Sequence, residues 1–430
     1  MKSWKGPQLF QTPFICWAML EGMRPWVCLL PWALGLVLAQ PSSPTPLPPV
    51  QAIPPGEMQP LAPGQRPAPT LPQIVLNPPI RFVERIAWAS NGFVEAAEAL
   101  VLIPEASTTP SFMLTKAQRV VAETFAARPS LSYVDVSIYS RREYAGFGGP
   151  LPRFTASVSR ARLNEFLRLN LSNFLQFDHL WIKPQDAFYG PPAPVTDELE
   201  LTPQFQGTRA QLRAQQLEQT VASQQGGVVG NRLFHGDPRQ RVVALTFDDA
   251  PHPLFEPLLL DTLRRAGVRA TFFCIGRNAE AYPYFVRDMV QQGHEVANHT
   301  YHHVRLNGLD EASVTAEIVQ ANQVLQAITG KPIVYFRPPG GRFSPTVLEV
   351  MRRLNMTVVF WTDDPGDFDN IGQGPLEARL LRRLRPGGIV LLHDNVLQTI
   401  AVLPRFLALA GQQGYRLGTV GGLVQGVDRR

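Results

Sequence analysis

Strands and helices alternate along the C-terminal part of the chain. From Arg241 onward, short apolar segments are separated by amphipathic segments of helical length. The predicted strands are residues 242–247, 270–275, 295–298, 334–337, 357–362, 388–392 and 415–420, and helical segments include 255–266, 312–328 and 376–384. Seven β/α repeats predict an α/β fold with a parallel sheet curled into a distorted, incomplete (β/α)7 barrel. A functional site is expected at the carboxyl ends of the strands, where side chains converge.

Five polar motifs fall at or just after the ends of these predicted strands. They are Thr246-Phe247-Asp248-Asp249, His299-Thr300-Tyr301-His302-His303, Arg337-Pro338-Pro339-Gly340-Gly341, Asp364-Pro365-Gly366-Asp367 and Leu391-Leu392-His393. Together they offer metal ligands, a spare carboxylate, an arginine and a further histidine. This combination is a full set for metal-assisted hydrolysis, and the ordered set is more specific than any single motif.

The histidines of the second motif have metal-ligand spacing. His299 and His303 are four residues apart, so on one helical turn they share a face and can grip one divalent ion. His302 competes with His303 on geometry alone. Asp249 is the natural third ligand, and two imidazoles with one carboxylate leave coordination positions open, as catalysis requires. The alternative is a group of solvated surface histidines.

The other motifs offer acid–base groups. Asp248 and Asp249 can point to different sides of an extended strand, so Asp248 is free to take a proton from water. His393 ends an apolar run and can protonate a leaving amine. Asp364 or Asp367 could hold its far nitrogen.

Arg337 could pair with Asp248 and keep that carboxylate ionised. The alternatives for these residues are a polar turn at the aspartates, a surface ion pair at Arg337 and a hydrogen-bonded strand end at His393. Gly340 and Gly341 follow two prolines, so their backbone can approach a ligand closely, and an N–H there could stabilise an oxyanion.

The sequence of the N-terminal part predicts an export signal followed by a linker. Arg24 precedes an apolar run over residues 25–39 that ends in Val37-Leu38-Ala39, which predicts a signal peptide or, uncleaved, a membrane anchor over 1–39. Residues 40–79 are rich in proline and poor in charge, so they predict a disordered or polyproline linker.

Between the linker and the barrel, the pattern predicts a small α+β domain. Thr115 is the expected cap of a helix, and apolar residues alternate at 134–138 and 154–158, as in half-buried strands. Ser159 could cap a second helix. No catalytic constellation is evident here. The predicted units are 1–39, the linker 40–79, the α+β domain 80–205, a connecting helix and loop 206–236 (helix 207–225), and the catalytic domain 237–430.

The net charge limits the kinds of binding partner to expect, and the cysteine content limits the disulfides that can form. The net charge is +5, without a basic tract interleaved with aromatics, which argues against nucleic acid. A mildly basic protein suits an anionic wall or membrane surface. Cys16 and Cys28 lie in the leader, so only Cys274 remains, as a core residue, and no internal disulfide is expected.

These motifs resemble the NodB-homology polysaccharide deacetylases, carbohydrate esterase family 4, over about residues 241–420. The resemblance implies a NodB-type barrel. It also implies that Asp248 is the catalytic base and that Asp249, His299 and His303 bind the metal.

The resemblance further implies that Arg337 orients the base, that Asp367 supports the catalytic histidine and that His393 is the acid. Substrate or oxyanion contacts are expected at Gly340, Phe368 and Leu391.

The chain departs from the family pattern at three positions. Ala250 stands where the family usually has Gly, Gly340 replaces an aromatic residue, and Phe368 replaces a Trp. These changes alter the groove but remove no ligand or acid–base residue.

The resulting expectation is an exported hydrolase, secreted, periplasmic or tethered in the cell envelope, that removes N-acetyl groups from a polysaccharide. Peptidoglycan is the first choice, followed by an exopolysaccharide or chitooligosaccharide, and an O-acetyl xylan esterase is the same-site alternative. The expected metal is zinc, although two imidazoles and a carboxylate also accept cobalt, nickel or manganese. The alternative of another class is a catalytically silent glycan-binding protein.

Overall fold

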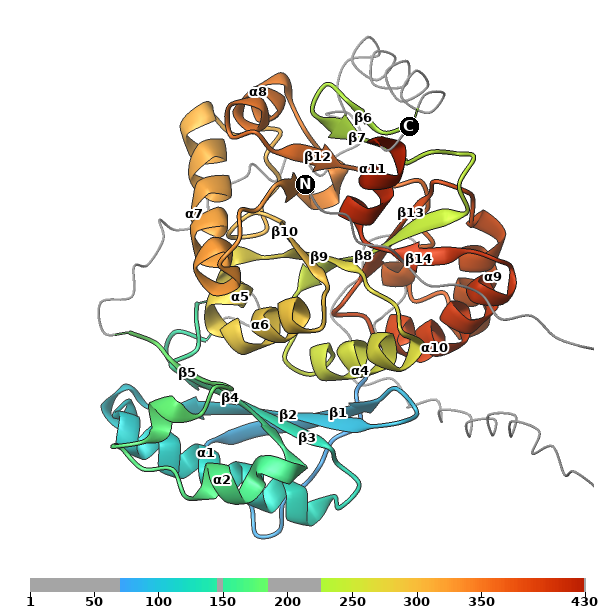
Figure 1. Cartoon of the computed structure of the whole chain (residues 1–430). Helices are drawn as coiled ribbons and strands as arrows, with labels where there is room; N and C mark the ends of the chain where they lie inside the picture. The colour runs from blue at the N-terminus through green and yellow to red at the C-terminus, as the bar shows by residue number, and fades with distance from the viewer. Residues whose placement is uncertain (1–69, 145–149, 185–225, 429–430) are drawn as a thin grey trace, which may run out of the picture. The chain divides into compact units, whose positions relative to one another are not determined.

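The computed structural model describes residues 70–144, 150–184 and 226–428 (Figure 1). The predicted leader 1–39, with Cys16 and Cys28, lies outside the described residues, as do residues 40–69 of the predicted linker and the predicted connecting helix 207–225. Among the helices of the described ranges, none is long and apolar enough to cross a membrane.

The N-terminal described segment is an α+β module built on a five-stranded sheet. In spatial order its strands are β1 (Val83–Ser90), β2 (Glu95–Ile103), β3 (Tyr133–Ser140), β4 (Phe154–Ser159) and β5 (Leu180–Ile182). Strands β2 and β3 are parallel, and the other neighbouring pairs are antiparallel. Helices α1 (Pro110–Ala127) and α2 (Leu163–Leu167) bury Val120, Phe125 and Phe166 in a core with these strands.

Helix α1 begins before the predicted capping residue. Thr109 is its N-cap, because the Thr109 side chain accepts the Phe112 N–H at 3.3 Å and Pro110 occupies the first turn. The prediction that Thr115 caps this helix is wrong, since Thr115 lies inside it. Ser159 precedes a short 3-10 turn and makes no side-chain capping bond, so it does not cap α2.

Two segments outside the predicted domains belong to the folded parts. Gln73, placed in the predicted linker, forms a bridge with Ala87 of β1, and Leu76 is buried beside it in the module's core. The predicted connecting loop contains β6 (Val228–Val229) and β7 (Arg232–Leu233), which pair with each other and extend the barrel sheet from β12. Both segments are fixed by backbone pairing with partners distant in sequence.

All seven predicted barrel strands are present. They are β8 (Val242–Ala250), β9 (Thr271–Cys274), β10 (Glu295–Asn298), β11 (Tyr335–Phe336), β12 (Thr357–Val359), β13 (Ile389–His393) and β14 (Arg416–Gly418). The sheet runs β13-β8-β9-β10-β11-β12-β7-β6, with β14 also on β8. Every pair between these seven strands is parallel. The distorted α/β barrel is therefore confirmed.

The chain beyond β12 curls back to β13, where Asp363 bridges Val390. Helices surround the sheet (Figure 1): α4 (Glu256–Ala266), α5 (Gly276–Ala281), α6 (Pro283–Gln291), α7 (Glu311–Thr329), α8 (Pro345–Arg353), α9 (Gln373–Arg383), α10 (Leu397–Gln412) and α11 (Val420–Asp428). Helices α4, α7 and α9 correspond to the three predicted ones. Because all parallel strands end on one side, the motifs that follow them meet there.

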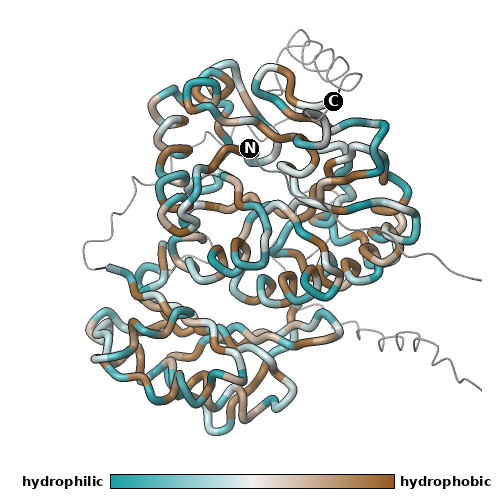
Figure 2. Tube along the Cα trace, viewed as in Figure 1, coloured by the Kyte–Doolittle hydropathy of each residue, from teal (hydrophilic) through white to brown (hydrophobic). Residues whose placement is uncertain are grey.

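Apolar residues fill the barrel's core. Phe247 and Phe272 stack with ring centroids 5.3 Å apart, and Cys274 is buried with a free thiol, as predicted. Figure 2 shows hydrophobic and hydrophilic residues alternating along the barrel helices, as expected for helices with one buried face. This packed core gives the strand ends a rigid base.

Candidate active site

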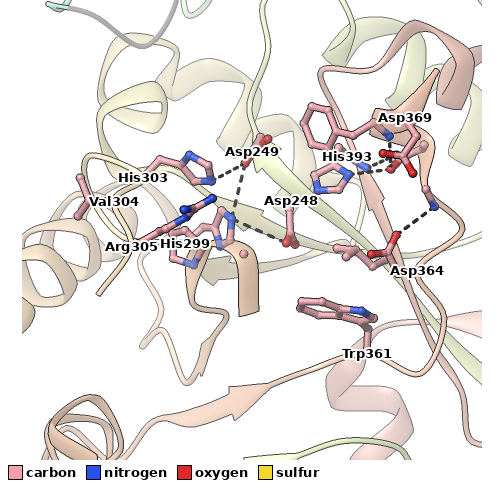
Figure 3. Close-up of a pocket in the computed structure, with 16 residues that line it drawn as sticks. Asp248, Asp249, His299, His303, Val304, Arg305, Trp361, Asp364, Asp369 and His393 are labelled. Atoms are coloured by element: carbon pink, nitrogen blue, oxygen red, sulfur yellow. Dashed lines mark hydrogen bonds and ion pairs between the residues drawn. The ribbon is translucent and has the colours of Figure 1, made fainter. Parts of the chain in front are cut away.

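A cavity of about 650 Å³ opens at the carboxyl ends of the barrel strands (Figure 3). Nine of the residues predicted for the site line it: Asp248, Asp249, His299, His303, Gly340, Asp367, Phe368, Leu391 and His393. The tenth, Arg337, lies behind the cavity wall and is completely buried. The topology thus brings all ten predicted residues into one site.

Asp249, His299 and His303 converge on one point. The Asp249 Oδ1 lies 3.1 Å from His303 Nε2 and 3.6 Å from His299 Nε2. One ligand atom from each residue lies within 4.8 Å of the other two. The Nδ1 of His299 lies 2.8 Å from the Arg337 carbonyl oxygen. A proton on Nδ1, donated to that carbonyl, leaves Nε2 free to bind an ion.

The protonation states and hydrogen bonding of these groups fit a divalent metal. Oδ1 of Asp249 is buried and accepts no hydrogen bond, so an acceptor is left facing the two imidazoles. Burial alone would raise the pKa of Asp249, but His303 and His299 lower it by more, and the net pKa is well below its usual range. Burial also lowers the pKa of His299 to about 4. A carboxylate and a neutral imidazole are the forms that bind metals.

Both aspartates of the first motif face the cavity because the strand is bulged between them. The register of β8 against β9 shifts between Asp248 and Ala250, and Asp249 has a positive φ of 70°. The strand therefore does not stay extended here, which was the condition for the two side chains to point to different sides. The bulge places one carboxylate beside the histidines and keeps its neighbour close to them.

The segment from His299 to His303 is a tight loop and not the helical turn assumed from its spacing. Thr300 and His303 have positive φ values of 65° and 60°. The Thr300 N–H donates to Asn298 Oδ1 at 2.7 Å, and the His303 N–H donates to Thr300 Oγ1 at 3.0 Å. These local bonds, and not helical periodicity, bring the two imidazoles together.

Glu317 of α7 holds this loop by hydrogen bonds, and no local sequence pattern indicated its role. Its buried carboxylate accepts the Tyr301 N–H at 3.1 Å and the His302 N–H at 2.9 Å. His302 Nδ1 lies 2.6 Å from the same carboxylate. His302 is thereby drawn away from the cavity, which resolves its competition with His303.

We expect Glu317→Gln to weaken metal binding by about 10- to 100-fold, because outer-shell partners orient the ligands. Glu317 uses one carboxylate oxygen for the two backbone N–H groups and the other for the His302 imidazole. A glutamine side chain has only one oxygen that can accept a hydrogen bond, so it cannot replace both. Titration of the metal-free protein would measure the affinity. Glu311→Gln is the matched control, since Glu311 lies on the same helix but is exposed and pairs with Arg353. Equal metal affinity of the two variants would contradict this role.

Asp248 is held by a fully buried guanidinium. Arg337 Nη1 donates to Asp248 Oδ1 at 2.7 Å and to Thr246 Oγ1 at 2.9 Å. The other guanidinium nitrogens donate to the carbonyls of Val359 and Phe360, both at 3.2 Å. Arg337 therefore does not form the surface ion pair considered as its alternative. One carboxylate oxygen of Asp248 remains toward the cavity, 3.7 Å from His299 Nε2.

His393 is oriented by Asp367 and not by Asp364. His393 Nδ1 lies 2.8 Å from Asp367 Oδ1, and the His393 N–H donates to Asp367 Oδ2 at 2.8 Å. Thr399 Oγ1 also donates to Oδ2, whereas the Asp364 side chain is exposed and accepts the Gly366 N–H. Burial lowers the pKa of His393, but Asp367, together with the weaker effects of Asp249 and Asp248, raises it by more, to about 9.

Asn395 is a second residue that the sequence pattern did not indicate. Its Nδ2 donates to Asp249 Oδ2 at 3.1 Å. This bond occupies Oδ2 and leaves Oδ1, the oxygen close to the two histidines, for an ion. Asn395 follows the last motif by two positions, but asparagine after a strand is too common to signal a site.

The remaining predicted residues shape the cavity wall. Gly340 adopts a left-handed φ of 63° beside the cavity, and an added Cβ there would meet nothing within 4 Å. At Gly341 an added Cβ would lie 2.5 Å from the Trp361 ring, so the loop packs closely on that indole. The Phe368 ring is half exposed and lies 4.0 Å from the His393 ring, centroid to centroid. Leu391 contributes a buried apolar surface.

The chain is similar to proteins of known family. A family model described as polysaccharide deacetylase matches residues 235–359. A peptidoglycan-N-acetylglucosamine deacetylase from Bacillus cereus is 33% identical over 191 residues, which cover 43% of this chain and 89% of that protein. A chitooligosaccharide deacetylase from Sinorhizobium fredii is 36% identical over 187 residues, which cover 40% of this chain and 87% of that protein. The crystal structure of a CE4 family pseudoenzyme from Bacillus anthracis matches with 28% identity and a TM-score of 0.44, covering 46% of this chain and 70% of that one.

Proposed function

The chain belongs to the polysaccharide deacetylase family, and from that premise we propose that it is a metal-dependent hydrolase of N-acetyl groups on a cell-envelope polysaccharide, with peptidoglycan as first choice. The observation that carries the proposal is the cluster of Asp249, His299 and His303 beside a carboxylate that is not needed as a ligand. That arrangement provides for both an ion and a base. Zinc is the first choice of metal on ligand chemistry.

Each group of site residues has a separate role in the proposed reaction. A divalent ion held by Asp249, His299 and His303 would supply a Lewis acid for the acetamide carbonyl. Asp248 accepts the proton of the attacking water, and Arg337 holds the Asp248 carboxylate in place. The backbone N–H of Gly340 is the proposed donor to the carbonyl oxygen as negative charge develops on it.

His393 then donates a proton to the departing amine, and acetate leaves. Because Nδ1 faces Asp367, Nε2 is the nitrogen available to carry that proton into the cavity. The raised pKa of His393 keeps the imidazole protonated at neutral pH, as a general acid requires.

The pH dependence follows from this assignment. Below about pH 9 His393 is protonated and competent as an acid, so kcat/KM for acetate release should fall as the pH rises through about 9. Asp367→Asn removes the carboxylate that raises the pKa of His393, so the fall in kcat/KM should occur at lower pH. The Asp310→Asn control changes an exposed helix cap and should leave the pH of this fall unchanged. If kcat/KM of Asp367→Asn fell at the same pH as that of wild type, the proposed role of Asp367 would be refuted.

The substrate test is a panel of acetylated glycans with acetate release as the readout. Peptidoglycan fragments, chitooligosaccharides and O-acetylated xylan separate the peptidoglycan proposal from the chitooligosaccharide and esterase alternatives. Metal content is measured on the same preparation. A metal-loaded protein that releases acetate from none of them would favour the silent glycan-binding alternative.

We also propose export to the cell envelope, on the strength of the apolar run at residues 25–39. Fractionation of cells that produce the full chain tests this location. Recovery of the whole protein in the cytosolic fraction would contradict it.

A further inference from the structure

Arg305 is a cavity residue that the proposed chemistry does not use. It follows the ligand His303 by two positions and lines the same cavity. Leu306, next to it, is completely buried, and the Leu309 N–H donates to the Leu306 carbonyl at 3.1 Å. The chain is therefore anchored at the residue next to Arg305, and Arg305 itself is half-buried and lines the cavity.

The Arg305 guanidinium pairs with no carboxylate within the described ranges. Arg337, the other arginine of the site, is paired with Asp248. Asp248 and Asp249, which line the same cavity, already have partners, because Asp248 binds Arg337 and Asp249 faces the two imidazoles. A guanidinium presents a rigid fork of donors that matches a carboxylate, so an unpaired one beside a catalytic cavity is suited to a ligand anion.

The charges of the cavity are arranged asymmetrically. Figure 3 shows Arg305 on the side of His299 and His303, whereas Asp364 and Asp369 lie on the side of His393. Asp364 and Asp369 are both exposed. A negatively charged substituent would be attracted to the first side and repelled from the second, so the asymmetry favours one orientation of an anionic substrate.

We infer that Arg305 binds a carboxylate carried by the glycan, on the acetylated sugar that reacts or on its neighbour. The inference rests on the proposed deacetylase function and narrows the substrate class to acidic N-acetylated glycans. Arg305 acts as a specificity-determining residue: it positions the chain through its substituent while the acetamide group lies at the aspartates and histidines.

The test uses two oligosaccharides of N-acetylated hexosamines that differ in one group. One carries a lactyl ether carboxylate on alternate sugars, and the other carries the same group as a carboxamide. The readout is the ratio of kcat/KM for acetate release from the acid and from the amide. Wild type is compared with Arg305→Gln, which loses the charge, and Arg305→Lys, which keeps the charge but loses the fork.

We expect Arg305→Gln to lower this ratio by about 10- to 100-fold, the scale of a hydrogen bond to a charged group. Arg305→Lys should lie between that variant and wild type. The matched control is Arg352→Gln, since Arg352 is exposed on α8 outside the cavity and should keep the wild-type ratio. A ratio in Arg305→Gln equal to that of wild type would overturn the inference, whether or not both rates fall together.

A binding measurement separates this inference from the proposed function. The affinities of wild type and Arg305→Gln for the intact acid and amide are compared in the Asp248→Asn background, where turnover is suppressed. If no glycan is deacetylated by wild type but Arg305 still confers preference for the acid, the proposed function fails and the carboxylate site stands. If acetate is released and neither assay shows the preference, the function stands and the carboxylate site is wrong.

Discussion

Replacing Asp248 by Asn is expected to lower kcat for acetate release by about 10²- to 10⁴-fold, the range that a positioned general base contributes. Asparagine keeps the shape of the side chain but cannot accept the proton of the attacking water. Because Asp249, His299 and His303 are untouched, the variant should still bind one divalent ion. Steady-state acetate release and metal analysis on the same samples test both statements.

The control for this variant is Asp310→Asn, which makes the same chemical change at an exposed N-cap, where Asp and Asn serve equally well. It should retain wild-type turnover. If Asp248→Asn and Asp310→Asn release acetate at the same rate, Asp248 is not the base and the proposed mechanism is wrong.

Replacing Arg337 by Leu is expected to lower the free energy of unfolding by about 3–5 kcal/mol, the usual cost of breaking a buried ion pair from one side. The guanidinium is completely buried and donates to Asp248, Thr246 and two carbonyl groups. Its loss leaves the Asp248 carboxylate without its cationic partner. Denaturant unfolding of metal-free protein measures the change, and the variant should also lose most of its turnover.

Two further variants test whether the loss of stability in Arg337→Leu comes from the buried ion pair with Asp248. Arg352→Leu removes an exposed arginine that pairs with Glu349, and exposed pairs contribute at most about 1 kcal/mol. In a double-mutant cycle, Asp248→Asn combined with Arg337→Leu should cost less than the sum of the single changes, because the buried charge is gone. A loss in Arg337→Leu no larger than in Arg352→Leu would show that the ion pair does not stabilise the fold.

The barrel could be predicted because its signals are local. An apolar run such as Ile389–Leu392 and an amphipathic helix such as α4 are each visible within a short window. The alternation of such runs implies parallel strands, and parallel strands end on one side. For that reason the motifs containing Asp248, His299 and His393 were expected to meet, as they do in the structure.

The N-terminal module was predicted less completely. Its strands β3 and β4 alternate apolar and polar residues, but β2 is almost entirely buried, including Glu98, and its sequence has no such alternation. The start of α1 was misplaced because Thr109 and Thr115 both resemble capping residues, and only the backbone path decides between them.

The sequence by itself determined the positions of the seven β/α repeats along the chain, the place of the site at the carboxyl ends of the strands and the residue types that meet there. Motif spacing left Asp364 and Asp367 both open as partners of His393, the family resemblance implied Asp367, and the structure places Asp367 there. Only the tertiary structure decided that Glu317 draws His302 aside and that a loop presents the two ligand histidines. The physical reason is that a strand or a helix is indicated by the pattern of apolar and polar residues within a short stretch of sequence. A hydrogen bond between residues far apart in the chain, such as Asn395 with Asp249, depends on how the whole backbone is folded.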